Sequence, residues 1–107
     1  MAGGATFKGR DRLAKGYLVA HIRVHDAEKF QEFRALAGPA VAEHGGRVLV
    51  GNPVSDFREG EVRGVTTVIE FDDLAAATRF YESEAYGAAR AVREMCAETD
   101  LLLVEGV

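Results

Sequence analysis

A strictly alternating segment, residues 17–24, constrains the fold of this chain more than any other feature. Every even-numbered position in it is apolar, whereas the odd-numbered positions form a mixed set, Tyr17, Val19, His21 and Arg23. Successive side chains of a β-strand point to opposite faces of the sheet, so a period of two indicates a strand with one face on the core. The mixed face is then expected to line a cleft or an interface.

The remaining segments follow in the order β-α-β-β-α-β. A first helix is expected to begin after Asp26, a favourable N-cap, and to end at His44-Gly45-Gly46, where a glycine can adopt the left-handed conformation. A second helical region is expected after Asp72-Asp73, with a fresh N-cap at Ser83. The helix after Ser83 is expected to carry Ala85, Ala88 or Ala89, Val92 and Cys96 on its inner stripe. The other predicted strands begin at about residue 47, run from about 63 to 71, and run from 100 to 105.

Three short motifs predict local irregularities. Gly38-Pro39 predicts a kink in the first helix or a restarted helix with Pro39 at its first position, because proline lacks the amide hydrogen. Gly51-Asn52-Pro53 predicts a bulge or bend in the second strand. Glu59-Gly60 is typical of a hairpin turn.

This order of elements predicts an α+β fold, the ferredoxin-like sandwich, with one four-stranded antiparallel sheet and both helical regions on one face. Residues 15–107 would form this single domain, and residues 1–14, which show no apolar period, would form a mobile N-terminal extension. The sheet face without helices would carry Tyr17, Val19, Leu49 and Val68, which is too apolar to leave in water. We therefore expect a symmetric homodimer in which a second copy packs on this face.

The charge balance and the single cysteine restrict the function classes. The 107 residues carry 17 acidic and 13 basic side chains, a formal charge of −4, whereas a nucleic-acid binder needs a basic field. No apolar run approaches the roughly 20 residues of a membrane span, and the N-terminus lacks the apolar core of a signal peptide. Cys96 has no partner for an internal disulfide and is expected to be a small buried hydrophobe. We therefore expect a cytoplasmic protein that binds neither nucleic acid nor membrane.

Five stretches together resemble a known bacterial family. They are residues 15–20, 38–47, 68–71, 80–86 and 103–106, and they occur in the family's order. The chain resembles, over about residues 15–107, the family called domain of unknown function 1330, of the dimeric α/β-barrel superfamily. The resemblance implies a ferredoxin-like protomer, a dimer, and a small cavity between each sheet and its helices or partner.

The resemblance leaves the reaction open. Relatives in the superfamily include cofactor-independent oxygenases, polyketide cyclases, muconolactone isomerase-like enzymes and haem-handling proteins. Where the family commonly has Ser-Pro-Glu-Tyr, this chain has Ser83-Glu84-Ala85-Tyr86, so Tyr86 stays in register but the glutamate is missing. A shared fold does not select among these functions.

The candidate catalytic residues are His21 and Glu70. The imidazole of His21 has its ordinary pKa near neutrality and could act as a general acid or base. Glu70 falls on the matching face of the third strand and could orient the ring. A simple hydrogen bond across the dimer interface remains the alternative for His21. Candidate substrate-binding residues are arginines near strand ends and phenols: Arg23, Arg47, Tyr17, Tyr81 and Tyr86.

Metal and cofactor sites have little support in the sequence. His21 and His25 would lie about 13 Å apart along a strand, too far to share one metal ion. His44 is expected to be a surface cap at a helix end, and haem could bind only through His44 or His21. We therefore expect no metal or cofactor.

The leading hypothesis is a small cofactor-independent enzyme that performs acid/base chemistry on an organic metabolite in a sheet-face pocket. The alternatives are a non-catalytic metabolite-binding dimer and a structural or accessory dimer.

Overall fold

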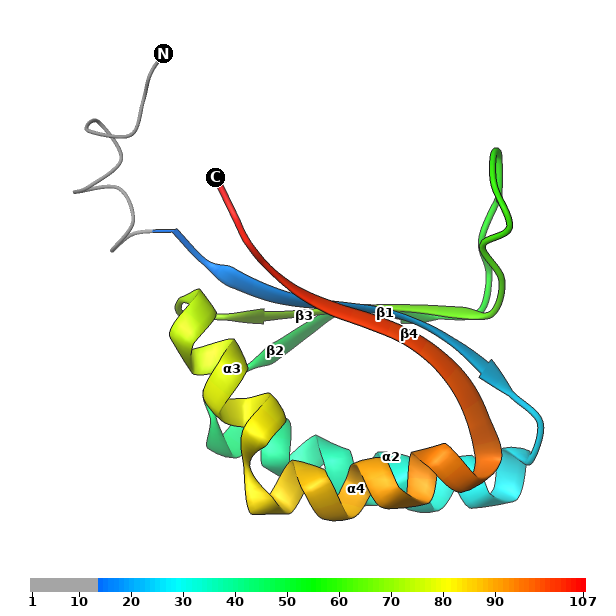
Figure 1. The fold of residues 1–107 in the computed structure, drawn as a ribbon, viewed down its shortest axis with the longest axis horizontal. Coiled ribbons are helices and arrows are strands. Elements are labelled where there is room, and N and C mark those ends of the chain that lie inside the picture. The colour runs from blue at the N-terminus through cyan, green and yellow to red at the C-terminus, as the bar shows by residue number, and fades with distance from the viewer. Residues whose placement is uncertain (1–13) are drawn as a thin grey trace.

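The computed structural model describes residues 14–107 and contains one antiparallel sheet with three helices on one side of it (Figure 1). The predicted ferredoxin-like sandwich is thereby confirmed. The N-terminal extension expected over residues 1–14 lies outside the described residues, except for Ala14. The strands are ordered β2-β3-β1-β4. The elements are β1 (Gly16–Val24), α2 (Ala27–Glu43), β2 (Arg47–Asn52), β3 (Val65–Phe71), α3 (Leu74–Glu82), α4 (Glu84–Cys96) and β4 (Ala97–Glu105).

Each helix begins at the N-cap that the sequence indicates. The carboxylate of Asp26 accepts a hydrogen bond from the Lys29 amide at 3.1 Å, and that of Asp73 accepts one from Ala76 at 2.8 Å. The Ser83 hydroxyl accepts one from the Tyr86 amide at 3.1 Å and separates α3 from α4. Each cap satisfies one amide that has no partner inside the helix, which is worth about 1 kcal/mol.

Helix α2 runs through Pro39 without a break, so the restart expected there does not occur. A side chain before proline normally disfavours helical backbone because its Cβ meets the proline ring. Gly38 has no Cβ, which removes this clash. The helix ends as predicted: His44 is the C-cap, and Gly45 adopts a φ of +72°.

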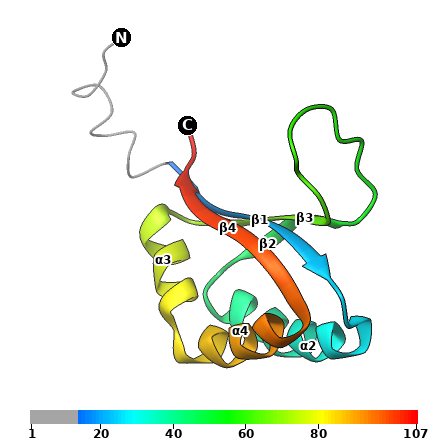
Figure 2. The same ribbon diagram turned by 45° about the vertical axis from the view of Figure 1, so that its right-hand side comes forward.

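Strand β2 is an edge strand, and all six of its residues are exposed. Its pairing with β3 shifts between Val48 and Val50, so the bulge lies at Leu49 rather than at Gly51–Pro53. Gly51 pairs regularly with Thr67, and the strand ends before Pro53, which has no amide hydrogen to donate. The connection over residues 53–64 projects from the sheet on the side away from the helices (Figure 2).

The core lies between the sheet and the helices. Leu18, Ala20 and Ile22 of β1 point into it and are at most 5% exposed. An aromatic cluster packs against them, with ring centroids 5.1 Å apart for Phe71–Phe80 and 4.6 Å apart for Phe80–Tyr86. Burial of each such side chain contributes about 1.5–3 kcal/mol. This cluster fixes α3 and α4 on the sheet, whereas α2 packs chiefly against α4.

Candidate functional site

A pocket of about 160 Å³ lies inside the protomer, between the helix-facing side of the sheet and helices α2 and α4. We call it the helix-side pocket. Its walls are predominantly apolar. The lining residues are Leu18, Ala20, Ile22, Phe30, Phe33, Arg34, Ala37, Gly38, Val41, Val48, Gly51, Val65, Thr67, Ile69, Phe80, Tyr86, Arg93 and Leu101.

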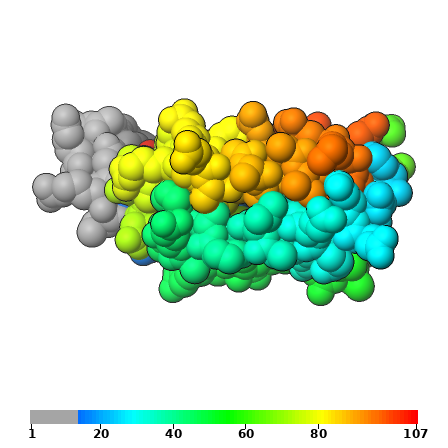
Figure 3. Space-filling view, turned by 90° about the horizontal axis from the view of Figure 1, so that it is seen from below, coloured from blue at the N-terminus to red at the C-terminus, as the bar shows by residue number. Residues whose placement is uncertain are grey.

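The helix-side pocket opens between α2 and the edge strand β2. Its exposed lining residues are Arg34 and Gly38 of α2 and Val48 and Gly51 of β2, whereas the other lining residues are buried or half-buried. Seen from the helix side, α2 and α4 lie side by side and form a continuous surface (Figure 3). A ligand therefore has its entrance at the β2 edge.

A buried arginine is the main polar feature of the helix-side pocket. Arg93 of α4 is 5% exposed, and its Nη1 donates a hydrogen bond to the Tyr86 hydroxyl at 2.5 Å. Its guanidinium lies 5.9 Å from the ring centroids of both Phe33 and Tyr86. The Nε of Arg93 is buried without a hydrogen-bond partner in residues 14–107. No carboxylate in that range forms a salt bridge with it, since the ion pairs found there involve other cations.

The electrostatics of the helix-side pocket favour a negative ligand. Among residues 14–107, its lining includes Arg34 and Arg93 but no aspartate or glutamate. Burial raises the pKa of the Tyr86 phenol, and the positive charge of Arg93 offsets part of this rise. The phenol is therefore protonated at neutral pH, and because it accepts from Arg93 it can donate its own hydrogen to a ligand oxygen.

Arg93 is not among the site residues that the sequence predicts. The sequence predicts that Ala85, Ala88 or Ala89, Val92 and Cys96 form the inner stripe of this helix. Ala89 and Cys96 are buried and Val92 is partly buried, as predicted, but Ala85 is exposed, and Tyr86 and Arg93 are buried as well. Arg93 follows Ala89 by four positions and precedes Cys96 by three, so it lies on the same helix face. The sequence signal for its burial was a charged residue at helical spacing from the apolar residues of the inner stripe.

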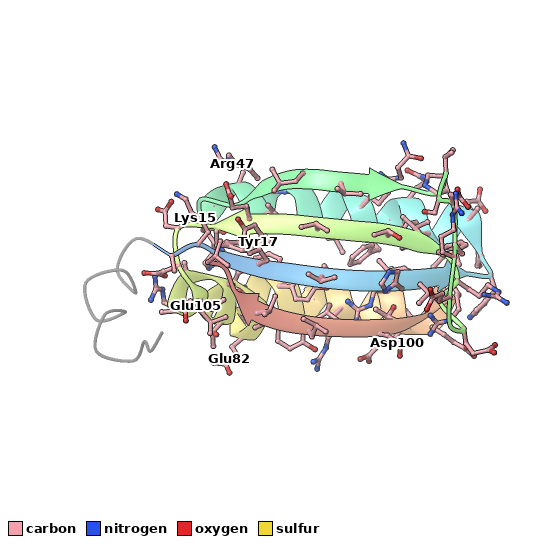
Figure 4. All side chains as sticks on the ribbon, turned by 90° about the horizontal axis from the view of Figure 1, so that it is seen from above. Lys15, Tyr17, Arg47, Glu82, Asp100 and Glu105 are labelled. Carbon is pink, nitrogen blue, oxygen red and sulfur yellow. The ribbon has the colours of Figure 1, made fainter. Side chains whose placement is uncertain are left out.

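Most of the predicted site residues lie on the opposite side of the sheet, which we call the open face. It carries Tyr17, Val19, His21 and Arg23 of β1, Thr66, Val68 and Glu70 of β3, and Asp100, Leu102 and Val104 of β4. Viewed from this side, Tyr17 and Arg47 lie at one end of the sheet and Asp100 lies toward the other end (Figure 4). None of these residues lines the helix-side pocket.

The expected pairing of His21 with Glu70 is wrong. His21 lies opposite Thr66 and Asp100, whereas Glu70 lies opposite Tyr17, four positions along β1. Four strand residues span about 13 Å, too far for a carboxylate to orient the imidazole. The Glu70 carboxylate instead accepts a hydrogen bond from the Tyr17 hydroxyl at 3.0 Å and pairs with Arg47.

The remaining predicted residues form local pairs. The Arg23 guanidinium lies 3.2 Å from the Asp100 carboxylate and 3.9 Å from that of Glu98, across the β1–β4 pair. The Tyr81 hydroxyl accepts a hydrogen bond from Arg90 at 2.9 Å, and its ring centroid lies 5.5 Å from that of Tyr86. Of the seven predicted site residues, Tyr86 alone lines the helix-side pocket.

The other chemistry-bearing side chains have structural surroundings. Within residues 14–107, no three His, Cys, Asp or Glu side chains cluster in a way that could hold a metal ion. The Nδ1 of His44 is 2.8 Å from the Ala40 carbonyl, and its ring meets Phe80 edge-on. Burial raises the pKa of the Cys96 thiol, which has no exposed surface. No described helix has the length and apolar character to cross a bilayer.

Comparison with known proteins supports the fold and identifies the family. A crystal structure of a protein of unknown function from Rhodopseudomonas palustris superposes with a TM-score of 0.74 at 18% identity, covering 96% of this chain and 90% of that one. SnoaB, a cofactor-independent oxygenase from Streptomyces nogalater, gives a TM-score of 0.62 at 16% identity, with coverage of 85% and 91%. A dimeric protein of unknown function with a ferredoxin-like fold from Bacteroides fragilis gives 0.52 at 14% identity, with coverage of 85% and 95%.

Sequence comparison is more specific than these structural similarities. A search of curated proteins gives no match. The family model of the domain of unknown function DUF1330, in contrast, matches residues 15–107, nearly the whole chain. This chain therefore belongs to the DUF1330 family.

Proposed function

We propose that this protein is a small, cofactor-independent enzyme that binds an organic metabolite in the helix-side pocket and stabilises negative charge on one of its oxygen atoms. The observation that carries this proposal is Arg93, a buried guanidinium whose Nε has no partner in the described part of the chain. A guanidinium in apolar surroundings interacts more strongly with an oxyanion than it would in water. Tyr86, hydrogen-bonded to Arg93, supplies a second donor.

The chemistry available in the helix-side pocket is charge stabilisation and proton donation. The phenol of Tyr86 would donate a proton or a hydrogen bond to a carbonyl or enolate oxygen while Arg93 balances the charge. Donors placed in this way typically contribute about 10²- to 10³-fold to the rate each. SnoaB, which has the same fold, is a cofactor-independent oxygenase, and this fits a reaction that proceeds through an anionic form of the substrate.

The indicator 4-nitrophenol tests charge stabilisation directly, because only its phenolate absorbs strongly in the visible range. Titration of the wild-type protein with this probe near neutral pH should increase its ionisation constant at least tenfold on binding. Arg93→Met should abolish this increase. Arg90→Met is the matched control, because Arg90 lies on the same helix but is only half-buried and does not line the helix-side pocket. An unchanged ionisation constant in the wild-type protein would contradict the proposal.

A second candidate is a non-catalytic metabolite-binding protein. The described part of the chain contributes no histidine, aspartate, glutamate or cysteine to the lining of the helix-side pocket, so this lining offers no general base of those types. Exchange of the α-protons of acetophenone for deuterium distinguishes the two functions. The enzyme should accelerate this exchange above the uncatalysed rate, with solvent accepting the α-proton while Tyr86 and Arg93 stabilise the enolate, and Tyr86→Phe should lose about 10²-fold. Binding of acetophenone without accelerated exchange would favour the non-catalytic protein.

The open face supports a homodimer. Several of its apolar residues and their neighbours in β2 are strongly exposed: Leu102 is 54% exposed, Leu49 51%, Val104 43% and Val50 40%. An apolar patch of this kind on a sheet is typical of an interface, and a two-fold axis lets a second copy cover it. The Bacteroides fragilis protein with this fold is dimeric.

In such a dimer, His21, Arg23 and Glu70 would belong to the interface rather than to the helix-side pocket. Light scattering should give twice the chain mass of 11.6 kDa. Val68→Lys, which places a charge in the middle of the patch, should shift the protein toward the monomer. His21→Ala should lower the stability of the dimer without changing the ionisation of bound 4-nitrophenol. A wild-type mass of one chain would contradict the dimer and leave the pocket proposal standing.

A further inference from the structure

The Arg93 guanidinium has an unmet requirement for negative charge. It is 5% exposed, it donates to a neutral phenol, and it lies 5.9 Å from the ring centroids of Phe33 and Tyr86. Burial of an unpaired charge costs several kcal/mol even after local relaxation. Arginine does not escape this cost by losing its proton. A negative group from outside the protomer would remove the penalty.

From this we infer that the natural ligand of the helix-side pocket is an organic monoanion about the size of one ring, whose anionic oxygen accepts from Nε of Arg93 and from the Tyr86 hydroxyl. This inference rests on the proposed function, since it names the class of molecule that the same pocket takes. A carboxylate on an aromatic or alicyclic ring has the required charge and shape.

The volume of the helix-side pocket sets the size of the ligand. At about 160 Å³ it is close to the roughly 150 Å³ of an engineered apolar cavity that binds benzene. Phe30, Phe33 and Phe80 contribute aromatic rings to the walls and would pack against the ring of the ligand. A fused two-ring body would exceed this space unless it protruded through the entrance.

The arrangement of charges argues for one negative charge inside the pocket. Among the lining residues that the structure describes, Arg93 is the buried cation, and it can neutralise a single anionic group. Arg34 lies at the entrance, exposed, with its guanidinium 5.9 Å from the Phe30 ring centroid. A positive side chain there attracts anions to the opening, which matters because the chain carries a net charge of −4.

Titrations with three probes test this inference on the full-length protein. Benzoate is the one-ring monoanion, benzamide is its neutral analogue, and 2-naphthoate is the two-ring monoanion. Nuclear magnetic resonance measures the dissociation constants and follows the Nε–H signal of Arg93. Benzoate should bind at least tenfold more tightly than both other probes and should shift the Nε–H signal downfield. Arg93→Met should weaken benzoate binding at least tenfold, and the control Arg90→Met should leave it unchanged.

Each alternative outcome removes a distinct part of the inference. Equal affinities for benzoate and benzamide would overturn the anionic class but leave a pocket for neutral oxygen compounds. Binding of 2-naphthoate as tight as that of benzoate would overturn the size limit. Resonance shifts confined to the open face would overturn the site itself. If none of the three probes binds but 4-nitrophenol still does, the inference of a carboxylate ligand is wrong and the proposed function is kept. If 4-nitrophenol does not bind either, both the inference and the proposed function are wrong.

Discussion

Replacing Tyr86 by phenylalanine should destabilise the protein by far more than the loss of one hydroxyl normally would. The change removes the acceptor for Arg93 Nη1, while Nε of the same buried guanidinium already has no hydrogen-bond partner in residues 14–107. A hydrogen bond to a charged group contributes about 1.5–3 kcal/mol. We therefore expect Tyr86→Phe to lower the free energy of unfolding by about 2 kcal/mol. Tyr81→Phe is the matched control, because its partner Arg90 is only half-buried and also pairs with Glu94, and it should cost less than about 0.5 kcal/mol.

The double variant Tyr86→Phe/Arg93→Met separates this explanation from a general packing effect. It removes the charge and the hydroxyl together, and replacement of buried ionic groups by apolar ones is often neutral or stabilising by about 1–4 kcal/mol. Urea denaturation at a fixed protein concentration should therefore rank the double variant at least as stable as the wild type, and Tyr86→Phe below both. The reasoning would be refuted if the double variant were as unstable as Tyr86→Phe, or if Tyr86→Phe matched the Tyr81→Phe control.

Three further predictions concern other parts of the fold. The Cys96 thiol should react with Ellman's reagent only after unfolding, because it is fully buried and its pKa is raised by burial; fast labelling of the native protein would contradict this. Gly16→Ala should destabilise the protein by about 1–3 kcal/mol, since its new Cβ would meet the backbone of Asp73. Gly87→Ala has open space around its new Cβ and should be neutral or slightly stabilising in the same denaturation assay. Burial raises the pKa of the Tyr86 phenol in the folded state, so this phenol should contribute its full stabilisation below about pH 10 and lose it as the pH rises through its folded-state pKa. The fall in the free energy of unfolding at alkaline pH should therefore be smaller in Tyr86→Phe.

The fold was largely predictable because its signals are local. The alternation in β1, the caps at Asp26 and Ser83, and the glycine after His44 each act over a few residues. The errors occur where tertiary contacts decide. β4 begins at Ala97, directly after α4, because pairing with Val24 of β1 extends the strand beyond its apolar run.

The candidate site was less predictable because it depends on register and on helix rotation. The sequence places His21 and Glu70 on one face of the sheet, but only the β1–β3 register shows that they are four positions apart. On α4 the inner face includes Arg93 as well as the partly buried Val92, and Arg93 is the more deeply buried of the two. The predicted stripe assumes that the buried positions of the helix carry apolar side chains, and this assumption fails beside a pocket that holds a charged side chain.

A crystal structure with 4-bromobenzoate tests most directly whether the helix-side pocket is the ligand site. The anomalous signal of bromine locates the ring without ambiguity. We expect the carboxylate within about 2.8 Å of Arg93 Nε and the bromine directed toward the entrance between Arg34 and Val48. A bromine peak only on the open face beside His21, with Arg93 Nε still unpartnered, would contradict the assignment of the site.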